Sequence, residues 1–205
     1  MKFENIKNIV RETPSEPIDI NNRYSVLIPF IEVEGEPHLL YELRSKTLKS
    51  QPGEISFPGG SIEEGEGIID AAVRETCEEL LINPDKIEVY GEGNFLVNPY
   101  GSILYSVVGK LNVDIKDIKP SADEVEDVFT VPLKYFMEKS PESYEIEFKA
   151  QRDKYFPYEL IPNGKNYKFK KSRDSVLFYQ YGKFIIWGFT AKMTHNFVNK
   201  IKKNL

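Results

Sequence analysis

The spacing of apolar residues along the chain predicts short strands with helices inserted singly between them. Runs rich in β-branched and aromatic residues predict strands over 24–33, 38–43, 87–97, 103–113, 125–131, 176–180 and 184–187. Helical spacing is clearest over 68–81, and helices are also expected over 132–137 and 190–203. This order favours a mixed α/β layer architecture rather than a regular βαβ repeat.

The same pattern indicates one domain. No repeat, low-complexity segment or Pro/Gly/Ser-rich linker divides the chain, so we expect a single domain over 23–205. It follows an arm, 1–22, that is polar, contains Pro14 and Pro17, and is expected to be irregular or partly helical.

Composition excludes several classes of protein. The 205 residues include 27 Lys and Arg against 32 Asp and Glu, a net charge of −5, which disfavours sequence-independent DNA binding. No apolar run approaches the roughly 18 residues of a membrane span. Cys77 is the only cysteine, so neither an intramolecular disulfide nor a cysteine-rich zinc site is available. The amino terminus has no secretory signal pattern, and we expect a cytoplasmic protein.

Candidate chemistry lies on the helix expected over 68–81. At about 100° per residue, Glu75, Glu78 and Glu79 fall within an arc of roughly 100°, opposite the apolar face. Like charges at this spacing disfavour a helix, and a divalent cation would offset them. Mg²⁺ prefers oxygen ligands and often bridges carboxylates to substrate phosphates. An acidic protein could hold a polyphosphate in this way.

Residues around these glutamates could complete such a site. Gly59 and Gly60 allow close backbone approach, and a turn there could aim a carbonyl at the metal. Arg74 could orient a neighbouring carboxylate such as Glu66. Glu75 could act as a general base if its environment brings its pKa toward neutrality.

The spacing of these residues resembles a known signature. Gly60, then Glu66, then Arg74-Glu75-x-x-Glu78-Glu79 and Ile82 resemble the Nudix box of the Nudix hydrolase superfamily, with departures at Leu81, where glycine is usual, and at Thr76, where an aliphatic residue is usual. Upstream, Leu40, Arg44-Ser45, Gly53 and Phe57-Pro58-Gly59-Gly60 resemble the motif of the coenzyme A pyrophosphatase subfamily, with Lys49 in place of arginine. Segments 123–133 and 186–191 extend the likeness, which covers about 24–195.

The resemblance implies a Nudix-type α/β/α sandwich with a mixed β-sheet. It also implies hydrolysis, dependent on Mg²⁺ or Mn²⁺, of the diphosphate of coenzyme A or acyl-CoA to 3′,5′-ADP and (acyl-)4′-phosphopantetheine. The implied metal ligands are the Gly59 carbonyl, Glu75, Glu78 and Glu79. The resemblance implies Glu75, Glu124 and Arg74 as catalytic residues, with Glu75 or Glu124 as the base and Glu126 as a second candidate for the loop acid. Arg44, Lys49 and Gly60 are the expected substrate-binding residues.

Two other functions remain open at this point. The first is a Nudix diphosphatase of another nucleoside diphosphate derivative, such as ADP-ribose, NADH or an oxidised dNTP. The second is a non-catalytic nucleotide- or RNA-binding Nudix domain. The expected partner is a small-molecule nucleotide, and neither DNA nor a membrane is expected to bind. Whether the chain forms a homodimer stays open. The basic residues between Lys165 and Arg173 could meet a 3′-phosphate or a nucleic acid, although a solvated loop or strand edge is favoured; His38 and His195 are interpreted as structural.

Overall fold

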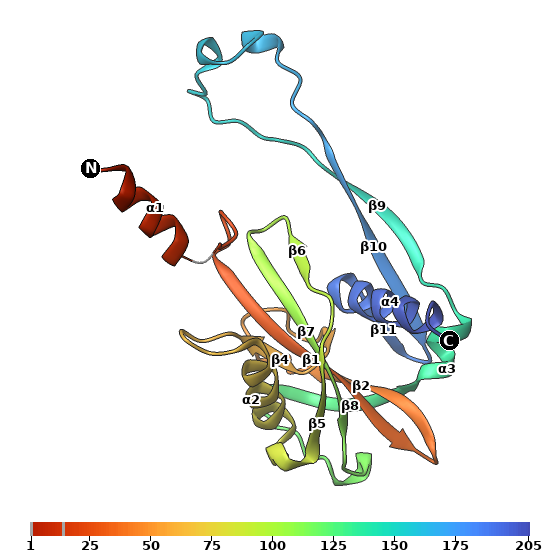
Figure 1. The fold of residues 1–205 in the computed structure, drawn as a ribbon. Helices are drawn as coiled ribbons and strands as arrows, with labels where there is room; N and C mark the ends of the chain where they lie inside the picture. Colours follow the sequence, from red (N-terminus) through yellow and green to blue (C-terminus); the bar gives the residue numbers. More distant parts are fainter. Residues whose placement is uncertain (1, 14) are drawn as a thin grey trace.

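The body of the protein is a mixed β-sheet (Figure 1). The computed structural model describes residues 2–13 and 15–205. The strands of the main sheet are β1 (Asn22–Val33), β2 (Glu36–Arg44), β3 (Ile55–Ser56), β4 (Gly59–Ser61), β5 (Ile87–Glu92), β6 (Leu96–Asn98), β7 (Ser102–Leu111) and β8 (Val125–Pro132). β1 pairs in parallel with β7 and antiparallel with β2. The predicted mixed sheet is therefore confirmed.

Helices cover both faces of this sheet, α2 (Ile68–Leu80) on one and α4 (Gly188–Lys202) on the other (Figure 1). Side chains of β1 alternate between the two faces, as the pleat of a strand requires. Leu27 packs in one core with Ala72 of α2, whereas Ile28 packs in a second core with Ala191 of α4. The α/β/α sandwich expected from the sequence is present.

A second, smaller sheet lies beside α4 and consists of β9 (Glu142–Phe148), β10 (Ser172–Tyr181) and β11 (Phe184–Trp187). The short helix α3 (Leu133–Glu138) leads into it from β8. β9 and β10 form a long hairpin whose far end, residues 149–171, projects from the body and contains the 3-10 turns η3 (Tyr158–Leu160) and η4 (Gly164–Asn166) (Figure 1). The sequence pattern did not indicate β9, because acidic residues interrupt it and most of it is exposed.

The single strand predicted over 87–97 is wrong. β5 ends at Glu92, and β6 begins at Leu96 after a break. Gly91 has a φ of +144°, and the register with β7 shifts between Val89 and Gly91. Such a glycine bulge bends a strand, so the chain reaches β7 in two separate pairings. The remaining turns are η1 (Pro84–Lys86) and η2 (Ile115–Asp117).

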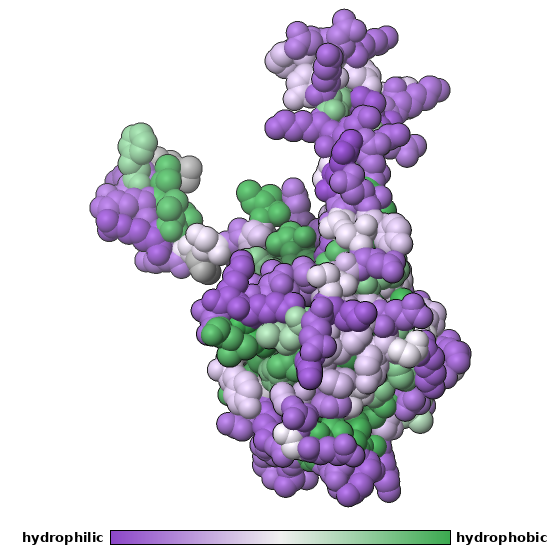
Figure 2. Space-filling view, turned by 90° about the vertical axis from the view of Figure 1, so that its right-hand side faces the viewer, coloured by the Kyte–Doolittle hydropathy of each residue, from purple (hydrophilic) through white to green (hydrophobic). Residues whose placement is uncertain are grey.

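The amino-terminal arm contains a helix, α1 (Phe3–Glu12), that buries no residue. It lies apart from the sandwich, and Figure 2 shows apolar side chains gathered along it. Its exposed apolar residues include Phe3, Ile9 and Val10. Pro14 lies outside the described residues, and the division of the chain at 22/23 stays a prediction. Within the described residues, no helix has the length and apolar character needed to cross a bilayer.

Leu81 ends α2 in a strained conformation, which provides a first test of the fold. Its φ of 50° and ψ of 44° are left-handed, and its side chain is 64% exposed, so burial does not offset the strain. We expect Leu81→Gly to raise the free energy of unfolding by about 0.5 kcal/mol, because relief of strain exceeds the added freedom of glycine in the unfolded chain. Calorimetry should show a higher melting temperature for Leu81→Gly than for Leu81→Ala, which keeps the strain. Equal values for the two variants would contradict this explanation.

Candidate active site

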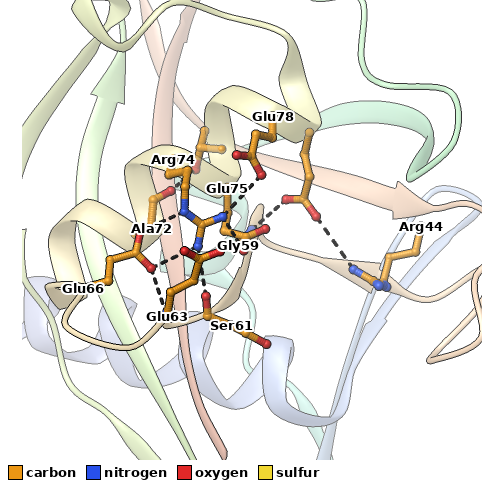
Figure 3. Close-up of polar contacts among 11 residues, drawn as sticks. Arg44, Gly59, Ser61, Glu63, Glu66, Ala72, Arg74, Glu75 and Glu78 are labelled. Carbon is orange, nitrogen blue, oxygen red and sulfur yellow. Dashed lines mark hydrogen bonds and ion pairs between the residues drawn. The ribbon is translucent and has the colours of Figure 1, made fainter.

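Figure 3 shows Glu75 and Glu78 on the side of α2 that faces Gly59 and Arg44, and Glu79 lies on the same side because it contacts both of these residues. The three glutamates differ in contact with water. The side chain of Glu78 is 58% exposed, that of Glu75 is 17% exposed and that of Glu79 is 4% exposed. The three carboxylates therefore range from exposed to buried, which helical spacing alone did not predict.

Arg74 connects two of these glutamates to the preceding loop. Its Nε and Nη2 donate to the two carboxylate oxygens of Glu66, at 2.8 and 3.0 Å. Its Nη1 donates to Glu75 at 2.8 Å and to Glu78 at 3.3 Å (Figure 3). The guanidinium holds the pKa of Glu66 at about 2, well below its usual range. The contact between Arg74 and Glu66 expected from the sequence is thus present, and Arg74 orients the outer part of the site.

Two glycines permit the close approach of β4 to α2. The Gly59 amide donates to Glu79 Oε2 at 2.7 Å. Gly59 has a φ of +151°, and a Cβ there would lie 2.3 Å from the backbone oxygen of Ser25. A Cβ on Gly60 would instead lie 2.3 Å from the carboxyl carbon of Glu75. Gly59 is therefore required by the fold, whereas Gly60 leaves space for the Glu75 carboxylate.

This difference predicts separable effects of two alanine substitutions. Gly60→Ala should displace the Glu75 side chain and lower kcat at least about tenfold, since a misplaced catalytic group costs that much or more. Its melting temperature should change little, because the group that moves is a side chain. Gly59→Ala should lower the melting temperature markedly, because its Cβ meets backbone. Steady-state kinetics and thermal melts of both variants test this, and full activity of Gly60→Ala would contradict the placement of Glu75.

Arg44, a residue of the upstream motif, lies close to a glutamate of α2 and to a glutamate of β2. Its Nη1 lies 3.8 Å from Glu42 Oε1 and 3.9 Å from Glu79 Oε1. Glu42, on β2, is fully buried and accepts a hydrogen bond from Ser56 Oγ at 2.8 Å. Sequence reasoning missed Glu42 as a site residue, although a lone acid within the apolar run of β2 was the available signal.

Burial raises the pKa of the inner carboxylates. Burial first, and then the neighbouring charge of Glu42, raise the pKa of Glu79 to about 9. Burial likewise raises the pKa of Glu42. The pKa of Glu75 is also raised, by burial, against the opposing effect of Arg74. The direction for Glu75 is the one a general base near neutral pH requires.

The loop before β8 places Glu124 beside the site. The Glu124 carbonyl accepts from the Ser45 amide, and the Glu79 carbonyl accepts from the Ser121 amide, each at 2.8 Å. The charge of Glu124 contributes to the raised pKa of both Glu75 and Glu42. Glu124 is thus within electrostatic reach of the inner carboxylates.

Two other predicted residues lie outside this group. Glu126 pairs with Lys46 at 2.8 Å on the surface. Lys49 is exposed and takes part in none of the ion pairs found across residues 2–13 and 15–205.

The two histidines and the basic residues between Lys165 and Arg173 lie away from the glutamates of α2. His38 contacts Thr130, and His195 lies between Tyr179 and Asn199. The basic residues from Lys165 to Arg173 belong to the far part of the β9–β10 hairpin, away from α2 (Figure 1). Among them, Lys171 and Arg173 pair with acidic residues of β9.

The donor set fits a hard divalent cation. It consists of carboxylate and carbonyl oxygens, the ligands that Mg²⁺ and Mn²⁺ prefer. Within the part of the chain that the structure describes, no three acidic, His or Cys side chains converge on one point. Arg74 instead binds Glu75 and Glu78 directly. Glu42 Oε2 is buried without a hydrogen-bond partner. A cation held here would exchange Arg74 contacts for metal contacts and draw further ligands from water and substrate phosphate.

Comparison with known proteins finds a matching family and several relatives. A family model described as the NUDIX domain matches residues 21–151. Nudix hydrolase 3 of Caenorhabditis elegans is 29% identical over 180 residues, 86% of this chain and 72% of the worm protein. The peroxisomal coenzyme A diphosphatase of Mus musculus is 37% identical over 118 residues, 57% of this chain and 50% of the mouse protein.

Two further matches complete the comparison. The mitochondrial coenzyme A diphosphatase of Homo sapiens is 32% identical over 123 residues, 58% of this chain and 52% of the human protein. The chain therefore spans about half the length of the mouse and human diphosphatases. The crystal structure of a MutT/nudix family protein from Enterococcus faecalis superposes with a TM-score of 0.54 at 11% identity, over 98% of this chain and 70% of that one. This last likeness concerns the fold alone.

Proposed function

The chain belongs to the Nudix family and is a hydrolase, and on that premise we propose that it cleaves the diphosphate of coenzyme A or acyl-CoA. The products are 3′,5′-ADP and (acyl-)4′-phosphopantetheine. The proposal rests on one observation above all: Arg44 of the upstream motif lies 3.9 Å from Glu79 of the glutamate face. The two motifs therefore meet in a single site. Similarity to the mouse and human coenzyme A diphosphatases supports the same substrate.

Metal binding falls to the glutamate face in this proposal. Glu75, Glu78, Glu79 and the Gly59 carbonyl would hold Mg²⁺ or Mn²⁺. When bound, the cation neutralises charge on the phosphate oxygens and lowers the pKa of a bound water. Arg74, anchored by Glu66, holds the Glu75 carboxylate in place before the cation binds.

The chain's own side chains bind and position the substrate. Arg44 binds a phosphate oxygen through its guanidinium, and Lys49 adds a second positive charge from its exposed loop. Gly60 keeps the space in front of Glu75 clear. Glu75 or Glu124 takes a proton as the water oxygen bonds to phosphorus, and the bond from that phosphorus to the bridging oxygen breaks. The raised pKa of Glu75 supports its place as the first candidate for the base.

The proposal also includes the partner, the location and the oligomeric state of the enzyme. Its partner is a small nucleotide, with no DNA and no membrane, and the lone Cys77 suits the reducing cytoplasm. The unburied helix α1 is available for a homodimer contact.

A substrate comparison tests the proposal. The purified protein is incubated with Mg²⁺ or Mn²⁺ and, separately, with coenzyme A, acetyl-CoA, ADP-ribose, NADH and an oxidised dGTP, and the products are identified by mass spectrometry. We expect the highest kcat/KM with a coenzyme A compound, releasing 3′,5′-ADP. Turnover of another compound alone would overturn the substrate and keep the Nudix chemistry. Tight nucleotide binding without turnover of any compound would overturn the catalytic assignment.

A further inference from the structure

Glu42 is a buried acid whose hydrogen bonds are incomplete. None of its side chain is exposed, and Oε1 accepts from Ser56. Oε2 has no hydrogen-bond partner. A buried carboxylate oxygen without a hydrogen-bond partner loses its hydration, and no new hydrogen bond offsets that cost. Proteins rarely tolerate this outside functional sites. The arrangement of β2 therefore leaves one ligand oxygen free inside the protein.

The carboxylates around Glu42 outnumber the cations. Glu79 lies near it, 4% exposed, and the charge of Glu42 is the second cause, after burial, of the raised pKa of Glu79. Among the described residues, Arg44 is the one basic group that pairs with both acids, and its Nη1 lies 3.8 and 3.9 Å from them, beyond hydrogen-bond distance. Two buried carboxylates thus face one loosely held guanidinium. With both acids ionised, the cluster lacks one positive charge, which a proton supplies at neutral pH and a cation could supply instead.

We propose that Glu42 is a further metal ligand, which shares a divalent cation with Glu79 on the inner side of the glutamate face. This rests on the proposed function, since it deepens the same metal site. Glu78 and Glu75 are more exposed than Glu42 and Glu79, so these four acids offer an outer and an inner position for a cation. Glu79 belongs to both. The inner position places a cation beside Arg44, the residue that binds substrate phosphate in the proposed function.

The effect of Glu42→Gln on metal affinity distinguishes a metal ligand from a carboxylate that only repels Glu79. If Glu42 is a ligand, Glu42→Gln removes a charged donor and metal binds less tightly. If Glu42 only repels the charge of Glu79, the same substitution makes Glu79 easier to ionise, and metal binds as tightly or more tightly. Gln has nearly the same shape as Glu and can still accept from Ser56.

Mn²⁺ binding, followed by electron paramagnetic resonance without substrate, provides the test. We expect Glu42→Gln to weaken Mn²⁺ affinity at least about tenfold and to remove one ion from the saturating stoichiometry. Glu64→Gln, an exposed loop acid outside the site, should bind as wild type does. Unchanged or tighter binding by Glu42→Gln would overturn the inference. If that variant does not fold, Glu42→Asp replaces it, with weaker binding expected and wild-type binding contradictory.

The two proposals fail in different ways. Wild-type protein that binds no Mn²⁺ would overturn the metal-dependent function itself. In the other case, the wild-type protein binds Mn²⁺ and hydrolyses coenzyme A, and the Glu42→Gln variant binds Mn²⁺ with equal affinity. That result would leave the proposed function in place and would remove only Glu42 from the metal site.

Discussion

Replacing Glu79 with glutamine is expected to lower kcat about a thousandfold and, at the same time, to raise the melting temperature of the metal-free protein. The loss of activity follows from removal of a ligand at a site where the cation neutralises phosphate charge, a contribution of about 4 kcal/mol. Glutamine keeps an oxygen that can accept from the Gly59 amide, so the local backbone remains supported.

The gain in stability follows from the surroundings of the carboxylate. Glu79 is almost fully buried beside a second buried acid, Glu42, and burial raises its pKa to about 9. Folding therefore opposes its ionised form, whereas a neutral amide carries no such cost. Opposite changes in activity and stability are typical of catalytic residues, whose arrangement serves the reaction rather than the fold.

Both changes are measured on the same preparations. Steady-state kinetics with Mg²⁺ gives kcat, and thermal melts in a chelator give the melting temperature at pH 8. Glu64→Gln, in the exposed loop before α2, is the matched control and should resemble wild type in both. A Glu79→Gln rate within about twofold of wild type would remove Glu79 from the metal site. An unchanged rate combined with a higher melting temperature would show a structural carboxylate only.

The elements that local spacing governs were predictable from the sequence. The helix from Ile68 to Leu80 lies within one residue of the expected range, because its apolar side chains recur at helical spacing. The pairing of Arg74 with Glu66 also follows from local geometry, since the two lie on one loop-helix segment.

Long-range packing explains what the sequence did not reveal. The burial of Glu79 involves contacts outside α2, with the Gly59 amide of β4 and with Arg44 at the end of β2. Glu42 is the one acid within the apolar part of β2, and only the tertiary packing around that strand shows that it is buried. Lys49 matched its motif position, yet its exposed loop leaves the side chain in solvent, so its contact with substrate stays a prediction.

The free energy of unfolding of the metal-free protein is expected to fall as the pH rises from 7 to 9. A carboxyl group with a higher pKa in the folded chain keeps its proton after the unfolded chain has lost its own. The folded state then binds more protons, and stability declines with pH. For Glu79 this interval runs from the ordinary value of 4.5 to about 9. The pKa values of His38 and His195 are lowered by burial, so their contribution ends near pH 6.5 and does not overlap with this range.

Calorimetry at constant ionic strength, with a chelator and then with Mg²⁺, measures the effect. One such group lowers the free energy of unfolding by up to about 2 kcal/mol between pH 7 and 9, and the melting temperature by about 4–8 °C. Saturating Mg²⁺ should remove most of the slope, because a bound cation makes the ionised carboxylate favourable. Glu79→Gln should also have a shallow slope, and Glu64→Gln should have the wild-type slope. A melting temperature that is flat in the chelator would mean that Glu79 is already ionised without metal, held by Arg44 and the Gly59 amide alone.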